Sequence, residues 1–307
     1  MINKIKKGSK IGVIAPAFQP DKEKLDKGLA YLLDSGYKVV RGKSLDAIYG
    51  YLAGNDLLRV DDLHTMFSDP EVDAIICARG GWGCLRILDQ LDYDLIRKNP
   101  KILVGYSDIT TLHLAIWKKS GLPGISGPMT AIEMGTGIEP FTEKHFWDQV
   151  YNTGQYYEFT WEPDSTETWQ TGEADGILLG GCLAMVAHQL GTDYSPDYKD
   201  SILLLEDVGE EPYRIDRYLA QLRQAGIFDQ INGLILGNFL DCENQNPDRP
   251  SFTVKEVLQE YCQDLKYPVI YDFPYGHGMI KISVPIGMHT QINTNLRSIK
   301  FANPFAR

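Results

Sequence analysis

Ser107 lies where an apolar run meets a helical pattern, and its hydroxyl is a candidate nucleophile. The run at 102–104 ends in Gly105-Tyr-Ser-Asp108, and the helical pattern begins directly afterwards. In an open α/β sheet such a turn projects its side chain at the carboxyl edge of the strands, where ligands bind. The same strand–Ser–helix geometry defines a nucleophile elbow, although Ile109 stands where the G-x-S-x-G pattern has its second glycine. The alternative interpretation is that Ser107 only caps the helix.

A serine hydroxyl is a weak nucleophile without a base, and His277 is the histidine whose surroundings fit that task. It lies between two glycines in Pro274-Tyr-Gly-His-Gly278. An irregular loop of this kind often carries function, although a surface histidine is the alternative interpretation. The other five histidines fall in helical, polar or strand-like stretches, where a structural role is expected.

The base works best when a carboxylate fixes its tautomer, and an apolar strand expected at 201–207 ends in two acidic residues. Glu206 follows a run of leucines at the end of this strand, as a triad acid should. Asp207, Glu210 and Glu211 are competitors that separation along the sequence does not exclude. The residue types therefore predict Ser–His–carboxylate chemistry and leave the acid open.

A second loop suited to chemistry follows the strand expected at 72–78. It is Arg79-Gly-Gly-Trp-Gly83, and its glycines let the backbone approach a ligand and point N–H groups at it. Beside Ser107 such a loop would supply half of an oxyanion hole, and the N–H of Asp108 would supply the other half. The glycines do not fit G-x-G-x-x-G, and no G-K-[ST] follows, which argues against a phosphate or dinucleotide loop. A plain tight turn is the remaining alternative.

Strands and helices alternate through the first 135 residues, which predicts βαβ units and a parallel sheet covered on both faces. Strands are expected at 11–17, 37–41, 72–78 and 102–104. Residues 136–172 change to short aromatic and polar pieces, typical of a linker with a hairpin or two. We therefore expect an N-terminal domain at 1–135 with the nucleophile, a linker at 136–172, and a C-terminal domain at 173–307 with the acid and the histidine.

Composition limits the partners and the compartment. A net charge of -11 argues against nucleic acid as a ligand. No apolar stretch approaches the thickness of a bilayer and no signal peptide is visible, so neither a membrane nor export is expected. The five cysteines are odd in number and lack a C-x-x-C pair, which fits a reducing cytoplasm better than disulfides or a zinc site.

Four spaced blocks together resemble the L,D-carboxypeptidases, the LdcA-type serine peptidases that include the microcin C immunity peptidases. The resemblance runs from about Ile11 to Ile299, with the blocks in family order. The blocks are Arg79-Gly-Gly81, Gly105-Tyr-Ser-Asp-Ile-Thr110, Leu205-Glu-Asp-Val-Gly-Glu210 with Tyr213-Arg-Ile-Asp-Arg217, and Gly276-His-Gly278 with Pro285-Ile-Gly287.

The resemblance implies an α/β fold with a Rossmann-like N-terminal domain, similar to class I glutamine amidotransferases, and a smaller C-terminal α/β domain rich in strands. It places Ser107 on the nucleophile, Glu206 on the triad acid and His277 on the general base. Gly81 and Asp108 fall on the oxyanion donors. The implied reaction releases the terminal D-alanine of murein tetrapeptides in the cytoplasm, in peptidoglycan recycling. The family also implies a homodimer, with no metal and no organic cofactor.

Substrate recognition has several candidate residues. A free carboxylate suits the paired donors of an arginine, and Arg79 is the candidate, with Arg214 and Arg217 as rivals. Trp82 is a candidate aromatic wall of the substrate site. Cys182 stands where the family carries asparagine after paired glycines, and residues 281–283 also depart from the family pattern. These departures leave the details of the substrate open.

Two other functions compete with the murein carboxypeptidase. A microcin-type immunity peptidase would cleave an aminoacyl-nucleotide analogue, and Trp82 would then stack on the adenine. A non-catalytic protein that clamps a small ligand between two α/β lobes is the third hypothesis. The absence of a visible export signal and the presence of all three triad residue types in family blocks both weaken it.

Overall fold

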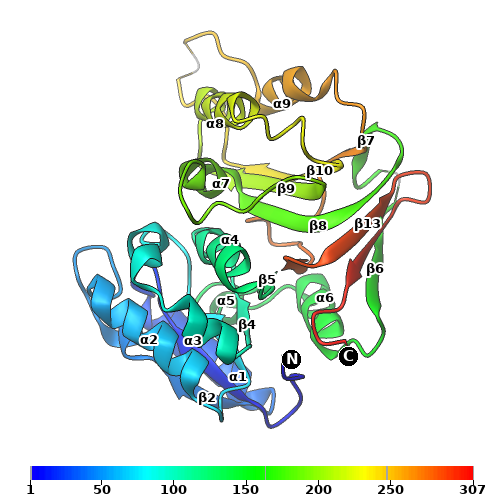
Figure 1. Cartoon of the computed structure of the whole chain (residues 1–307). Helices are drawn as coiled ribbons and strands as arrows, with labels where there is room; N and C mark the ends of the chain where they lie inside the picture. Colours follow the sequence, from blue (N-terminus) through cyan, green and yellow to red (C-terminus); the bar gives the residue numbers. More distant parts are fainter. Residues whose placement is uncertain (1, 163, 247, 307) are drawn as a thin grey trace.

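The computed structural model of the chain describes residues 2–162, 164–246 and 248–306. They form two lobes, each built on its own sheet, with helices packed on the sheets (Figure 1). The expected α/β class and the two-domain arrangement are confirmed. No helix of these residues is both long and apolar enough to cross a membrane.

The N-terminal lobe holds a six-stranded sheet in the order β12-β5-β4-β3-β1-β2. Its parallel strands are β1 (Lys10–Ile14), β2 (Lys38–Arg41), β3 (Ala74–Cys77), β4 (Ile102–Val104) and β5 (Gly124–Ser126). The connections contain α1 (Lys22–Asp34), η1 (Lys43–Asp46), α2 (Asp56–Ser68), η2 (Cys84–Gln90), α3 (Tyr93–Lys98) and α4 (Ile109–Ser120). Alternate residues of β1, β3 and β4 enter two different apolar clusters, one on each face of the sheet, so the centre of the sheet is buried on both sides as expected.

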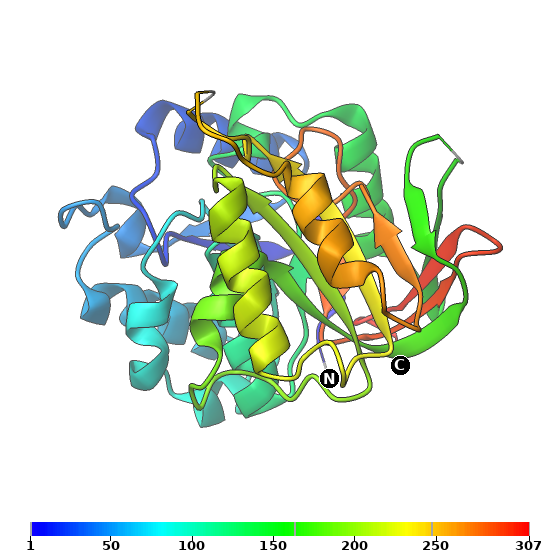
Figure 2. The same ribbon diagram turned by 90° about the horizontal axis from the view of Figure 1, so that it is seen from above.

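The C-terminal lobe holds an eight-stranded sheet in the order β6-β14-β13-β8-β9-β10-β11-β7. Its parallel centre is β8 (Glu173–Cys182), β9 (Ser201–Val208), β10 (Gly233–Leu240) and β11 (Val269–Tyr271). Antiparallel strands flank it: β6 (Tyr156–Thr160), β7 (Glu167–Gln170), β13 (His289–Asn293) and β14 (Ser298–Ala302). The helices of this lobe are α7 (Leu183–Gln189), α8 (Pro212–Gln224) and α9 (Val254–Cys262), and Figure 2 shows α8 and α9 side by side over the sheet.

Residues 136–172, where a linker with a hairpin or two was expected, contribute to both lobes. They contain α6 (Pro140–Tyr151), which follows the short helix α5 (Glu133–Thr136) and places Phe146 and Val150 in an apolar cluster of the first lobe. They also contain β6 and β7, the two edge strands of the second sheet. The second sheet therefore has more strands than the first, although the C-terminal domain was expected to be the smaller. The proposed boundaries at 135 and 173 stay a prediction.

The strand β12 (Val284–Ile286) belongs to the first sheet, although it comes late in the chain. It runs antiparallel to β5, with Val284 opposite Ser126 and Ile286 opposite Gly124. The expected C-terminal domain at 173–307 includes this strand, whereas its partner β5 lies in the first sheet. Proline has no N–H to donate to a neighbouring strand. It is tolerated at the centre of β12 because β12 is an edge strand with a neighbour on one side only. The pairing attaches the chain that follows the His277 loop to the first sheet, whose strand β4 leads into Ser107.

His113 on α4 supports the end of β4 from inside the core. Its Nε2 lies 2.8 Å from the carbonyl oxygen of Gly105, so the neutral ring donates a hydrogen bond to that oxygen. The imidazole is buried, and burial lowers its pKa to about 4. His113 is therefore neutral at pH 7 and serves the structure, as the sequence predicted for this residue.

The stability of the protein should fall in acid because of His113. The histidine of the unfolded chain has an ordinary pKa of about 6.5, so the unfolded state binds one more proton between about pH 4 and pH 6.5. This term should lower the free energy of unfolding by about 1.4 kcal/mol per pH unit as the pH falls through that window. Urea unfolding of the wild type and of His113→Gln, each measured from pH 7 to pH 4, checks this prediction. The glutamine keeps a donor for the Gly105 carbonyl and does not titrate. Parallel pH profiles of the two proteins would contradict this prediction.

Candidate active site

Ser107 occupies the turn between β4 and α4 in a backbone conformation that residues with a side chain rarely adopt. Its φ is +64°, in the left-handed region, which costs about 1–3 kcal/mol and is found mainly at functional sites. The N-cap position of α4 is Asp108, not Ser107. Within the described residues no side-chain hydrogen bond caps the start of α4, so the interpretation of Ser107 as a helix cap is wrong.

The glycine loop after β3 packs directly against this turn. A Cβ on Gly80 would lie 2.8 Å from Cβ of Ser107 and 3.2 Å from the backbone nitrogen of Asp108, so a side chain at Gly80 would displace the turn. Gly81 has a φ of +117°, and a Cβ there would lie 2.5 Å from Cγ of Phe18. The loop that carries Gly81 and the turn that carries Asp108 are therefore in contact, as the oxyanion-hole hypothesis requires.

Buried charges hold this loop in place. The Asp108 carboxylate accepts a hydrogen bond of 2.9 Å from the N–H of Cys84, and burial raises the pKa of this carboxyl to about 6. Arg59, a fully buried residue of α2, donates to the carbonyl oxygens of Pro16 and Gly83 at 2.5 and 2.9 Å. The loop is thus anchored to the ends of β1, β3 and β4. Arg59 has no signal in the sequence, because one arginine in a polar helix gives no sign of burial.

The candidate base and acid are joined by a direct hydrogen bond. Nδ1 of His277 lies 2.7 Å from Oε2 of Glu206, which is wholly buried on β9. Gly276 makes this approach possible, since a Cβ there would lie 2.7 Å from the same carboxylate oxygen. The imidazole is held by a carboxylate at Nδ1, which leaves Nε2 for proton transfer.

The competing acids have other partners. Oδ2 of Asp207 accepts a hydrogen bond of 2.9 Å from the N–H of Ala184, and Oδ1 accepts one of 2.9 Å from the N–H of Val208. Burial, and next the charge of Glu206, raises the pKa of Asp207 to about 7. Glu210 forms an ion pair of 3.4 Å with Arg214. Glu206, and neither Asp207 nor Glu210, is the acid bonded to the imidazole of His277.

The histidine and the serine turn meet through Tyr106. The rings of Tyr106 and His277 are 5.0 Å apart and meet edge to face at 70°. Since Tyr106 directly precedes Ser107, the imidazole packs beside the turn that carries the hydroxyl. A further bond between the lobes, 2.7 Å long, joins the hydroxyls of Ser126 and Tyr275. A hydroxyl, an imidazole, a carboxylate and a glycine-rich loop are thus brought to one place, a combination suited to acyl transfer.

Arg79 lies at the start of the glycine loop and has spare donors. Its Nε bonds to the Gly80 carbonyl at 3.2 Å, and its guanidinium lies 5.5 Å from the ring centroid of Phe18. No carboxylate of the described residues is within ion-pair distance of Arg79. The rivals Arg214 and Arg217 both lie over the ring of Tyr213, on the first turns of α8.

Trp82 faces the second lobe. Its ring meets the imidazole of His188 edge to face at 6.4 Å, and His188 in turn meets Tyr218 at 5.5 Å. The predicted substrate wall is therefore one end of an aromatic row that runs from the glycine loop to α7 and α8.

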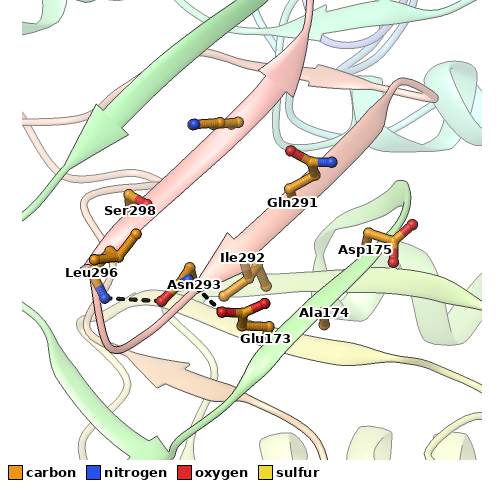
Figure 3. A pocket seen from close by; sticks show the side chains of 9 residues that line it. Glu173, Ala174, Asp175, Gln291, Ile292, Asn293, Leu296 and Ser298 are labelled. Carbon is orange, nitrogen blue, oxygen red and sulfur yellow. Dashed lines mark hydrogen bonds between the residues drawn. The ribbon is translucent and has the colours of Figure 1, made fainter.

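One cavity borders the histidine loop and another lies elsewhere. The first, of about 630 Å³, is walled on one side by residues 278–280, next to His277. The second, of about 310 Å³, lies on the face of β8, β13 and β14, and Figure 3 shows its polar lining of Glu173, Asp175, Gln291 and Asn293. No candidate catalytic residue lines the second cavity. Within the described part of the chain, no group of three or more His, Cys, Asp or Glu is placed to hold a metal ion.

Comparison with known proteins gives the family. Residues 11–127 match the model described as the LD-carboxypeptidase N-terminal domain, and residues 175–292 match that of the LD-carboxypeptidase C-terminal domain. A probable murein peptide carboxypeptidase of Bacillus subtilis is 40% identical over 293 residues, which cover 94% of this chain and 90% of that protein.

Solved structures agree with this assignment. A muramoyltetrapeptide carboxypeptidase from Oxalobacter formigenes matches with a TM-score of 0.84 and 28% identity, covering 95% of this chain and 98% of that one. The structure of MccF in complex with glutamyl sulfamoyl guanosine matches with a TM-score of 0.91 at 23% identity, covering 100% and 99%, which is a likeness of fold. The resemblance found in the sequence blocks is confirmed, and the chain belongs to the LD-carboxypeptidase family of serine peptidases.

Proposed function

We propose that this protein is a serine carboxypeptidase that hydrolyses the L,D amide bond of murein tetrapeptides and releases the terminal D-alanine. The observation that carries the proposal is the hydrogen bond of 2.7 Å between Nδ1 of His277 and Oε2 of Glu206, made beside the left-handed turn of Ser107. The names of two relatives support the substrate class, since one is called a murein peptide carboxypeptidase and the other a muramoyltetrapeptide carboxypeptidase.

In the proposed mechanism, Ser107 attacks the carbonyl carbon before the D-alanine. His277 accepts the serine proton at Nε2 and later delivers it to the leaving amine, while Glu206 holds the imidazole at Nδ1. The N–H groups of Gly81 and Asp108 stabilise the negative oxygen of the tetrahedral intermediate. Water then cleaves the acyl-enzyme by the same route. Contact of Gly80 with the serine turn supports this assignment, because it brings the two loops together.

Arg79 is the proposed partner of the substrate's free carboxylate. A peptidase that removes one terminal residue must recognise that group, and a guanidinium binds it with paired donors. The position of Arg79 supports this role, since its neighbour Gly80 touches Ser107 and no acidic side chain of the described residues occupies its donors. Trp82 is the proposed wall of the same cleft.

The competing functions have less support. The likeness to MccF at 23% identity is one of fold, whereas the relative at 40% identity is named for murein peptides. Membership of a peptidase family argues against a non-catalytic ligand-binding protein.

We further propose that the enzyme acts as a homodimer in the cytoplasm. Five unpaired, buried cysteines suit a reducing compartment, and light scattering of the purified protein would test the dimer.

Replacing Ser107 by alanine should abolish turnover without unfolding the protein. We expect kcat for release of D-alanine to fall by about 10⁴-fold or more, as for other triad serines, with an unchanged thermal midpoint. Mass spectrometry of the digest checks it, because the tetrapeptide should persist instead of becoming tripeptide. Ser120→Ala, at the other end of α4, is the matched control.

The same digest distinguishes the two peptidase functions. Wild-type protein and Ser107→Ala are incubated in parallel with a murein tetrapeptide and with an aminoacyl sulfamoyl adenylate. Cleavage of the adenylate alone would replace the murein function with the immunity function. Release of D-alanine by Ser107→Ala at the wild-type rate would disprove the serine mechanism.

Removing the guanidinium of Arg79 should weaken recognition of the substrate carboxylate. Loss of charged hydrogen bonds of about 1.5–3 kcal/mol predicts that kcat/KM of Arg79→Met falls about 10- to 100-fold, mainly through KM. A tetrapeptide with a C-terminal carboxamide should be a poor substrate for the wild type and should lose little further in the variant. Arg214→Met, which removes the rival, should behave like the wild type. If Arg214→Met shows the loss instead, the assignment passes to Arg214.

A further inference from the structure

An ion pair buried between the two lobes lies close to the candidate active site. Nζ of Lys281 is 2.5 Å from Oε1 of Glu133, and the two side chains are only 4% and 10% exposed. Glu133 begins α5 in the first lobe, and Lys281 lies between His277 and β12. Desolvation makes a buried ion pair expensive unless its geometry is good and its other donors and acceptors are satisfied.

The hydrogen bonds of Glu133 meet this condition. Oε1 also accepts a hydrogen bond of 2.7 Å from the Tyr106 hydroxyl, and Oε2 accepts one of 2.9 Å from the N–H of Met129. Burial alone would raise the pKa of Glu133, but the charge of Lys281 and these hydrogen bonds hold it below its ordinary value. Burial, and next the charge of Glu133, raises the pKa of Tyr106 well above its ordinary value, so its hydroxyl remains the donor.

The backbone at Lys281 is fixed as well. Its N–H donates a hydrogen bond of 3.0 Å to the Thr142 hydroxyl, and that hydroxyl donates one of 2.8 Å to the carbonyl oxygen of Met279. Thr142 is a buried residue of α6. The chain that follows His277 is thus held by α6 and directs the ammonium group at Glu133.

Tyr106 connects this ion pair to the catalytic groups. Nζ of Lys281 lies 4.1 Å from the centroid of the Tyr106 ring, which is within the range of a cation–π interaction. The same ring meets the imidazole of His277 at 5.0 Å, and its backbone leads directly into Ser107. One aromatic side chain therefore contacts the buried cation and the base, and it adjoins the nucleophile.

His277 needs such support. Glu206 holds its ring at Nδ1 alone, and a ring held at one atom can still swing about that bond. The edge of Tyr106 limits this motion only if Tyr106 is itself immobile, and Glu133 and Lys281 together hold it at the hydroxyl and over the ring.

We propose that Glu133 and Lys281 are positioning residues for the reaction. Their ion pair joins the lobes, holds Tyr106 against the imidazole of His277, and so sets the approach of the base to Ser107. This role rests on the proposed catalytic function of Ser107 and His277. Neither Glu133 nor Lys281 is assigned a contact with the substrate.

The test separates position from stability with two single variants and their combination. Glu133→Gln and Lys281→Met each leave one buried charge unpaired, so each should lower both the thermal midpoint and kcat. The double variant leaves no unpaired charge. Its amide oxygen can accept from the N–H of Met129, and its amide nitrogen can donate to the oxygen of the Tyr106 hydroxyl. We expect its thermal midpoint to return towards the wild type. Its kcat on murein tetrapeptide should stay about 10- to 100-fold low with KM changed less than about threefold, because a small misplacement of catalytic groups has effects of this size.

Lys255→Met is the matched control, because it removes a lysine from an exposed ion pair of 2.7 Å with Glu167. It should keep the wild-type kcat, and an equal loss there would overturn the proposal. Recovery of kcat together with the thermal midpoint in the double variant would overturn it too, since the pair would then act on stability alone. If the wild type releases no D-alanine, the proposed function itself fails. An active wild type with unaffected variants refutes only the positioning role.

Discussion

The antiparallel pairing of β12 with β5 is the interaction on which the site depends. The chain leaves the second sheet at β11, passes through the loop of His277, pairs with the edge of the first sheet at β12, and returns to the second sheet at β13. The histidine loop is therefore attached to a different sheet at each end. Without this pairing the base would move with the second lobe alone, and its distance to Ser107 would follow every motion between the lobes. The Ser126–Tyr275 bond reinforces the same connection near the middle of the loop.

The close approach of backbone segments explains why glycines lie against the candidate groups. At Gly80 a side chain would meet Ser107, and at Gly276 it would meet the Glu206 carboxylate. The site also keeps Ser107 in the left-handed region, where glycine would be the unstrained choice. Glycine has no hydroxyl, so the chemistry and the backbone make opposite demands at this position. The contacts of the turn with Gly80 and the buried carboxyl of Asp108 hold the strained conformation.

The sequence predicted the parallel first sheet, because its buried strands are apolar runs that alternate with helical patterns. It also predicted a carboxylate after the apolar run at 202–205 as the partner of His277, and the structure joins His277 to Glu206. It could not choose between Glu206 and Asp207 by physical reasoning alone. Adjacent residues on a strand point to opposite faces, and the face that the histidine loop covers depends on contacts distant in sequence. The edge strands β6 and β7 resemble a linker in the sequence because much of their surface is exposed and polar. The sheet that the short strand β12 joins has no signal in the sequence, since three residues carry no information on their partner.

The pairing of Glu133 with Lys281 had no signal in the sequence, because 148 positions separate the two residues. An ion pair nevertheless suits an interface that must hold the two lobes in one relative position, and not only in contact. An apolar contact is non-directional, so two lobes joined by apolar surface alone tolerate small shifts of one against the other. A carboxylate that accepts from Lys281, Tyr106 and Met129 at once is satisfied in one arrangement, and a shift of either lobe leaves a buried donor unpaired. Replacement of the pair by apolar residues would therefore keep the lobes together and lose the alignment that proton transfer between them requires.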